Sequence, residues 1–213
     1  MNVSIKICGI TRREDALEAE RLGAFAVGFV FYPGSRRFID PCQAGYISRS
    51  LSSSIEKVGV FVDEEPEVIR ETVRKASLTV VQLHGSEGPS FLQALEGIRI
   101  IKAFRVGEDF RSGILAGYQA DYFLLDTCVE GAHGGTGKTF DWTAALPCRE
   151  HGKIILAGGL HAGNVQEALR IARPWGVDVS GGVEEAPGIK DHEKMRAFFR
   201  AIDTCKYSDD GEK

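Results

Sequence analysis

The sequence lacks the segments that mark membrane and exported proteins. Its 213 residues contain no run that approaches the roughly 20 apolar residues of a membrane-spanning helix. The opening residues, MNVSIKICGI, do not join a basic region to a long apolar stretch, so we expect no signal peptide. These absences predict a cytoplasmic protein with no membrane partner.

A basic surplus and paired cysteines are also missing. The formal net charge is −4, whereas nucleic-acid-binding proteins usually carry an excess of Lys and Arg, so we expect no nucleic-acid partner. The cysteines are odd in number and show no CxxC spacing, which favours reduced thiols over a disulfide framework or a zinc site. They are Cys8, Cys42, Cys128, Cys148 and Cys205.

What is present is an ordinary globular composition with a repeated pattern. Hydrophobic residues make up 43% and charged residues 26% of the chain. The chain contains eight short apolar runs, and several of them carry apolar, often β-branched, residues at odd and even positions alike. Such runs are typical of parallel strands covered by helices. The expected strands span residues 3–7, 26–30, 56–62, 79–83, 98–103, 122–125, 153–156 and 177–179.

Amphipathic stretches separate these runs. The clearest lie at 14–22, 66–76, 89–95, 162–170 and 192–202, and weaker ones lie at 42–51, 111–116 and 143–146. Strands that alternate with helices indicate a parallel sheet with right-handed crossovers. An open doubly wound sheet is the alternative, but eight short repeats favour closure. We therefore predict a closed parallel (β/α)₈ TIM barrel as one domain over residues 1–205, with a frayed polar tail at 206–213.

Chemistry-bearing residues gather where the expected strands end. In this fold the active site lies at the carboxyl ends of the strands. Because side chains alternate between faces along a strand, Cys8 shares a face with Lys6, and Asp126 shares a face with Leu124. We therefore expect both Cys8 and Asp126 to point into the barrel opening, with Ile5 and Ile7 turned toward the helices.

Glycines near the last three strand ends indicate phosphate binding. Glycine lets the backbone approach an anion closely, and barrels commonly bind phosphate after strands seven and eight. A nucleotide-binding P-loop is unexpected, because its spacing requires glycine where Ala132 stands. The expected phosphate-binding residues are Gly135, Thr136, Gly137, Gly158, Gly159, Ser180, Gly181 and Gly182.

Beyond these local features, a series of motifs resembles the phosphoribosylanthranilate isomerase family over nearly the whole chain. The motifs, in the family's order, are KICGIT at 6–11, GFVF at 28–31, SRRFI at 35–39, VGVF at 58–61, VQLHG at 81–85, LLD at 124–126, GGTGKTFDW at 134–142, LAGGL at 156–160, VDVSGGVE at 177–184 and PGIKD at 187–191. The first motif and the GGTGKTFDW motif are the most specific. Arg36 and Gly181 depart from the family's usual Pro and Ser.

The resemblance implies an Amadori rearrangement in tryptophan biosynthesis. N-(5′-phosphoribosyl)anthranilate would become 1-(o-carboxyphenylamino)-1-deoxyribulose 5-phosphate, with no metal or organic cofactor. It implies that Cys8 is the general base, that Asp126 is the general acid, and that Arg37 grips the anthranilate carboxylate. Lys6 is a candidate for the cation that lowers the pKa of Cys8.

Several assignments stay open at this point. Gln82 and His84 either contact the substrate or support the barrel, and Asp178 either touches the substrate amine or holds a network on strand eight. We expect Lys6 and Lys102 to form buried ion pairs. Arg36, Lys138 and Lys190 are expected to be solvated.

Other functions compete with the isomerase. A phosphosugar aldolase would use Lys102 as a Schiff base, and a non-catalytic barrel would bind a phosphorylated ligand without needing an acid–base pair. An isomerase that also serves histidine synthesis would carry Asp where Cys8 stands. The partner in each case is a phosphorylated small molecule, and the sequence leaves both monomer and homodimer open.

Overall fold

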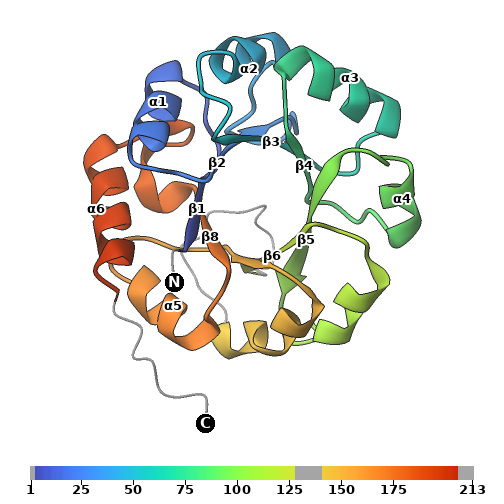
Figure 1. Cartoon of the computed structure of the whole chain (residues 1–213), viewed down its shortest axis with the longest axis vertical. Helices are drawn as coiled ribbons and strands as arrows, with labels where there is room; N and C mark the ends of the chain where they lie inside the picture. Colours follow the sequence, from blue (N-terminus) through green and yellow to red (C-terminus); the bar gives the residue numbers. More distant parts are fainter. Residues whose placement is uncertain (1–2, 128–140, 206–213) are drawn as a thin grey trace.

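The strands form a closed parallel barrel in the order of the sequence, β1 to β8 (Figure 1). The computed structural model describes residues 3–127 and 141–205. The barrel strands are β1 Ser4–Ile7, β2 Ala26–Val30, β3 Glu56–Phe61, β4 Val80–Leu83, β5 Arg99–Val106, β6 Tyr122–Thr127, β7 Ile154–Leu156 and β8 Gly176–Val179. The predicted (β/α)₈ barrel is confirmed, and β1 pairs with β8 to close it.

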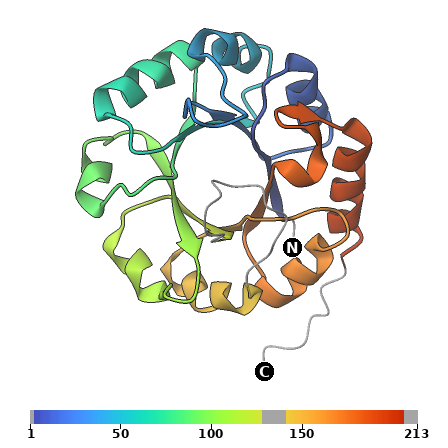
Figure 2. The same cartoon turned by 180° about the vertical axis from the view of Figure 1, so that it is seen from behind.

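Helices surround the barrel on the outside, as both views show (Figures 1 and 2). The α-helices are α1 Arg13–Arg21, α2 Pro41–Ser48, α3 Pro66–Ala76, α4 Pro89–Gln93, α5 Val165–Ala172 and α6 His192–Asp203. Proline begins α2, α3 and α4, where its missing N–H leaves no bond unmade. None of the helices in the described ranges combines the length and apolar character needed to cross a bilayer.

The segments that follow β5 and β6 differ from the α-helices that the sequence pattern indicated. They are the 3₁₀ helices η1 Ser112–Gly117, η2 Trp142–Ala145 and η3 Pro147–His151. Gly113 and Gly117 disfavour a longer α-helix in η1, and Pro147 interrupts the segment between η2 and η3. Short 3₁₀ turns therefore cover this part of the barrel.

Two apolar layers hold the fold together. The outer layer lies between strands and helices and contains Ile5 and Ile7, as the alternation along the first strand predicted. The inner layer fills the barrel with side chains that include Val58, Ile101 and Leu124. Cys8 packs with Val30 and Val60 in a separate small cluster, closer to the carboxyl ends of the strands.

A small antiparallel hairpin follows β8 and was not predicted. After the 3₁₀ helix η4 Gly181–Val183, strands β9 Glu184–Ala186 and β10 Ile189–Lys190 pair with each other. Lys190 was expected to be solvated, and this expectation was wrong: only 2% of its surface is exposed. The hairpin folds back against the end of β1 and buries the ammonium group there.

Candidate active site

A cavity of about 540 Å³ lies at the carboxyl ends of the barrel strands. Ten of the predicted site residues line it, namely Cys8, Arg37, Gln82, His84, Asp126, Gly158, Gly159, Asp178, Ser180 and Gly182. Gly181 does not line the cavity, although a side chain there would approach Arg37. Gly135, Thr136, Gly137 and Lys138 lie outside the described residues.

Cys8 sits immediately after β1, in a space that a glycine keeps open. Its backbone N–H donates to the carbonyl of Val179 at 2.9 Å, which ties the end of β1 to β8. A Cβ at Gly28 on neighbouring β2 would lie 2.9 Å from Sγ of Cys8 and 3.1 Å from Nζ of Lys6. The thiol and the ammonium group therefore both occupy the volume that a side chain at position 28 would take.

The electrostatics around Cys8 differ from the expectation that Lys6 lowers its pKa overall. Burial raises the pKa of the Cys8 thiol, and the charge of Lys6, which acts in the opposite direction, does not overcome it. The charge of Asp178, which pairs with Lys6 at 2.9 Å, adds to the effect of burial and also raises the pKa of the thiol. The thiol is therefore predominantly protonated at neutral pH in this structure.

The Lys6–Asp178 pair is buried inside the barrel, as predicted for Lys6. Burial by itself lowers the pKa of Lys6, but the charges of Asp178 and Cys8 outweigh that effect and leave the pKa raised. Asp178 thus belongs to a network across β1 and β8, one of the two roles left open for it. Its side chain also lines the cavity.

Asp126 is linked to His84 and Gln82. Nε2 of His84 lies 3.3 Å from Oδ2 of Asp126, and Nδ1 of the same ring lies 2.8 Å from Nε2 of Gln82. An amide nitrogen only donates, so with this amide orientation Nδ1 accepts and the proton of the neutral ring is on Nε2, facing the carboxylate. His84 and Gln82 are therefore arranged both to support Asp126 and to face the cavity.

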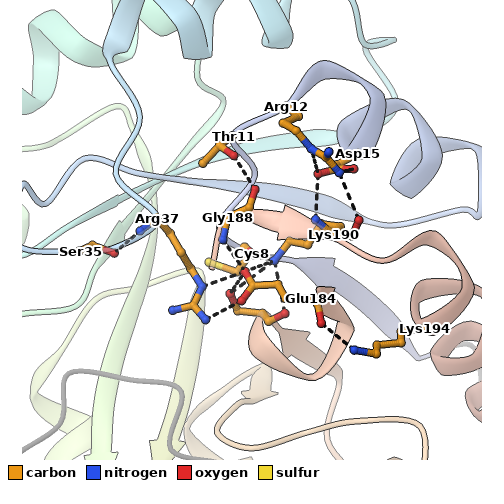
Figure 3. A network of polar contacts seen from close by, with 11 residues as sticks. Cys8, Thr11, Arg12, Asp15, Ser35, Arg37, Glu184, Gly188, Lys190 and Lys194 are labelled. Atoms are coloured by element: carbon orange, nitrogen blue, oxygen red, sulfur yellow. Dashed lines mark hydrogen bonds and ion pairs between the residues drawn. The ribbon is translucent and has the colours of Figure 1, made fainter. Parts of the chain in front are cut away.

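Arg37 extends to the hairpin that follows β8 (Figure 3). Its side chain passes close to Gly9. A Cβ at Gly9 would lie 2.5 Å from Cδ of Arg37, so this close approach requires glycine beside Cys8. Nε and Nη2 of Arg37 donate to the two carboxylate oxygens of Glu184 at 2.8 and 2.6 Å. One edge of the guanidinium is thus occupied by the protein itself.

The glycines after β7 expose their backbone to the cavity. Gly158 and Gly159 have φ values of 86° and 64°, in the left-handed region that favours glycine. Together with Ser180 and Gly182 after β8, they line one side of the cavity. Backbone N–H groups in such turns can converge on an anion.

Sequence reasoning missed several residues of the site. Tyr32 and Arg105 line the cavity, and both could have been found by extending the strand alternation, since Tyr32 follows Gly28 and Val30 and Arg105 follows Ala103. The sequence pattern predicts a fifth strand that ends at residue 103, but β5 continues to Val106. Glu184 and Lys190 lie beyond the predicted strands, so no strand alternation pointed to them.

Lys102, the candidate Schiff-base residue, lies outside the cavity. It faces the helices, where Nζ donates to Glu87 at 2.7 Å and to the carbonyl of Gly85 at 2.8 Å. This is the buried ion pair predicted for it. Within the described part of the chain, no group of three or more His, Cys, Asp or Glu side chains is arranged to hold a metal ion.

Comparison with known proteins agrees with this geometry. The family model described as N-(5′-phosphoribosyl)anthranilate (PRA) isomerase matches residues 5–201. The curated N-(5′-phosphoribosyl)anthranilate isomerase of Nitrosospira multiformis is 48% identical over 208 residues, covering 95% of this chain and 97% of the relative.

Solved structures show the same relationship. The phosphoribosyl anthranilate isomerase of Thermus thermophilus superposes with a TM-score of 0.88 at 42% identity, covering 96% of this chain and 100% of that one. A phosphoribosyl anthranilate isomerase in complex with reduced 1-(o-carboxyphenylamino)-1-deoxyribulose 5-phosphate has a TM-score of 0.82 at 40% identity, covering 95% and 99%. From the family match and these relatives, the chain belongs to the N-(5′-phosphoribosyl)anthranilate isomerase family.

Proposed function

We propose that this chain catalyses the Amadori rearrangement of N-(5′-phosphoribosyl)anthranilate in tryptophan biosynthesis, with Asp126 as general acid and Cys8 as general base. The observation that carries the proposal is that both side chains line one cavity, beside Arg37 and the glycine-rich ends of β7 and β8. We place the reaction in the cytoplasm. No metal or organic cofactor takes part in the proposed steps.

The two residues would act on adjacent bonds of the ribose. In its protonated form, Asp126 donates a proton to the furanose ring oxygen as the C1–O bond breaks, and the nitrogen lone pair forms an iminium at C1. Cys8, as the thiolate, removes the proton from C2, and the electrons of that C–H bond form the C1–C2 double bond of an enolamine. Tautomerisation then gives the ketone, so atoms and charge balance without a redox partner.

The raised pKa of Cys8 has two consequences for this role. It makes the thiolate a minority species at neutral pH, which limits the fraction of competent enzyme. It also makes that thiolate a stronger base toward a carbon acid, because base strength rises with pKa. The base assignment is therefore compatible with burial of the thiol.

The remaining site residues have proposed binding roles. Arg37 would hold the anthranilate carboxylate through guanidinium N–H groups that Glu184 does not use, while Gln82, His84 and Asp178 contact the substrate from the barrel interior. The proposed phosphate contacts are Gly158, Gly159, Ser180 and Gly182, which line the cavity, and Gly181, which adjoins it between Ser180 and Gly182. Gly135, Thr136 and Gly137 complete the proposed set and lie outside the described residues.

The test is loss of substrate fluorescence on conversion, with the labile substrate generated in situ. We expect turnover by the wild type and a fall of at least ~10²-fold in Cys8→Ser and in Asp126→Asn. Cys42→Ser and Asp121→Asn are matched controls, because neither residue lines the cavity. Cys42 is exposed, and the Asp121 carboxylate accepts from the backbone N–H of Ile100. A folded wild type that shows no turnover, or variants as active as their controls, would refute the proposal.

A further inference from the structure

Glu184 makes the most extensive polar contacts with Arg37 in the described part of the site (Figure 3). Oε1 accepts from Nε at 2.8 Å and Oε2 accepts from Nη2 at 2.6 Å, a bidentate pair that fixes the plane of the guanidinium. Such a pair resists rotation of the arginine side chain because both bonds must break together. The orientation of Arg37 at the cavity is therefore set by Glu184.

The carboxylate of Glu184 is itself held by further donors. Oε1 also accepts from Nζ of Lys190 at 2.8 Å, from the N–H of Gly188 at 3.2 Å and from Oγ of Ser180 at 3.4 Å. Burial raises the pKa of Glu184, but its contacts with Arg37 and Lys190 outweigh this and leave the pKa lowered. Glu184 is therefore ionised at neutral pH.

The hairpin that carries Glu184 is anchored to the first strand–helix unit. Nζ of Lys190 donates to the carbonyl of Cys8 at 2.5 Å, and the backbone N–H of Lys190 donates to Asp15 of α1 at 3.0 Å. Thr11 donates to the carbonyl of Gly188. The carboxylate that orients Arg37 is thus fixed relative to Cys8.

The donor count of a guanidinium allows Arg37 to hold a second anion. It has five N–H donors, and Glu184 uses the Nε–H and one of the two on Nη2. The edge formed by Nη1 and the other N–H of Nη2 is a second fork that matches a carboxylate. Arg37, Lys190 and Glu184 together carry one net positive charge, which one substrate carboxylate neutralises.

We propose that Glu184 is a positioning residue that orients Arg37 so that its second edge binds the substrate carboxylate. This inference rests on the proposed function, in which Arg37 contacts the anthranilate group. Glu184 touches no reacting atom in this account. Its contribution is to the affinity for substrates that carry the carboxylate.

The experiment compares two ligands that differ only in that group. One is reduced 1-(o-carboxyphenylamino)-1-deoxyribulose 5-phosphate, and the other is its phenylamino analogue without the carboxylate. We expect Glu184→Gln to weaken binding of the first about tenfold and of the second less than about twofold. The KM for the substrate is expected to rise in parallel with the first value. Equal weakening of both ligands would overturn the proposal.

A double-mutant cycle separates positioning from a general structural effect. In an Arg37→Met background, Glu184→Gln is expected to change affinity for the carboxylated ligand by less than about twofold, since the residue it orients is gone. Glu56→Gln is the matched control, because Glu56 also pairs with an arginine, Arg99, at 2.6 Å but lies outside the cavity. An undiminished effect in the Arg37→Met background would refute the inference.

One variant leaves Glu184 intact in case Glu184→Gln fails to fold. Arg37→Lys keeps the charge but loses the two-edged fork, so we expect it to pair with Glu184 and to lose the carboxylate-dependent affinity as fully as Arg37→Met. Full affinity in Arg37→Lys would overturn the proposal. Absence of turnover by the wild type would instead count against the proposed function, so the two failures are distinguishable.

Discussion

The ammonium group of Lys6 lies 2.9 Å from Oδ1 of Asp178, and the two residues are directly paired across the β1–β8 seam. The pair joins the first and last strands of the barrel and lies next to the proposed base, Cys8. A charged bridge inside the barrel thus serves the closure of the fold and sets the electrostatic environment of the thiol.

Removal of one partner of this bridge is expected to be strongly destabilising. In Lys6→Met the Asp178 carboxylate stays buried without its cation, which typically costs about 3–5 kcal/mol of unfolding free energy. Urea denaturation followed by circular dichroism measures this. Arg99→Met is the control, because the Arg99 side chain is 45% exposed and loss of its pair with Glu56 is expected to cost less than about 1 kcal/mol. Similar losses in the two variants would contradict the prediction.

Gly28→Ala is expected to damage the site through crowding. The added Cβ would lie 2.9 Å from Sγ of Cys8 and 3.2 Å from its Cα, and the backbone atom cannot move aside cheaply. We expect a destabilisation of about 1–3 kcal/mol and a lower kcat. Steady-state kinetics and thermal unfolding test this against Gly88→Ala, where a Cβ would meet nothing within 4 Å. Wild-type kcat in Gly28→Ala would show that the strands adjust freely.

The alkylation of Cys8 is expected to depend on pH in a characteristic direction. Because burial raises its pKa, the reactive thiolate is scarce at neutral pH and becomes the major form only above the ordinary thiol value of about 8.5. The rate of modification by iodoacetamide, measured by mass spectrometry, should therefore still be rising at pH 9. Exposed Cys42 provides an internal check that the reagent is active. A rate at Cys8 that levels off near pH 7 would show that Lys6 outweighs burial.

Lys102 is expected to resist covalent trapping. Its ammonium group is buried and donates to Glu87 and to the carbonyl of Gly85, and Lys102 lines a neighbouring pocket and not the cavity that holds Cys8. Borohydride reduction in the presence of a sugar phosphate or keto acid should therefore leave the protein mass unchanged. A stable adduct that disappears in Lys102→Met would support the aldolase alternative.

The barrel was predictable because its strands have a strong local signal. Buried parallel strands carry apolar residues on both faces, and all eight strands lie near their expected positions. The helical pattern after β5 and β6 was less reliable, since Gly and Pro there limit the segments to 3₁₀ turns. Local sequence preferences thus explain why the strands were predicted correctly and why the helices after β5 and β6 were not.

Alternation along the strands also placed much of the site. Cys8 lines the cavity because it lies two residues after Lys6, on the same inward face of the chain. Asp126 likewise lies two residues after Leu124, which points into the barrel. The roles assigned to them came from the family resemblance, which the comparisons support at the level of the family. Their roles in this chain stay predictions.

The sequence by itself therefore determined the barrel, the face on which Cys8 and Asp126 lie, and the family. Only the tertiary structure decided which polar groups meet. Arg37 pairs with Glu184, 147 residues away, and Lys190 donates to the carbonyl of Cys8, 182 residues away. Hydrophobic burial follows a period that is visible along the chain. Ion pairs between loops follow no period, because they depend on where the closed barrel brings distant strand ends together.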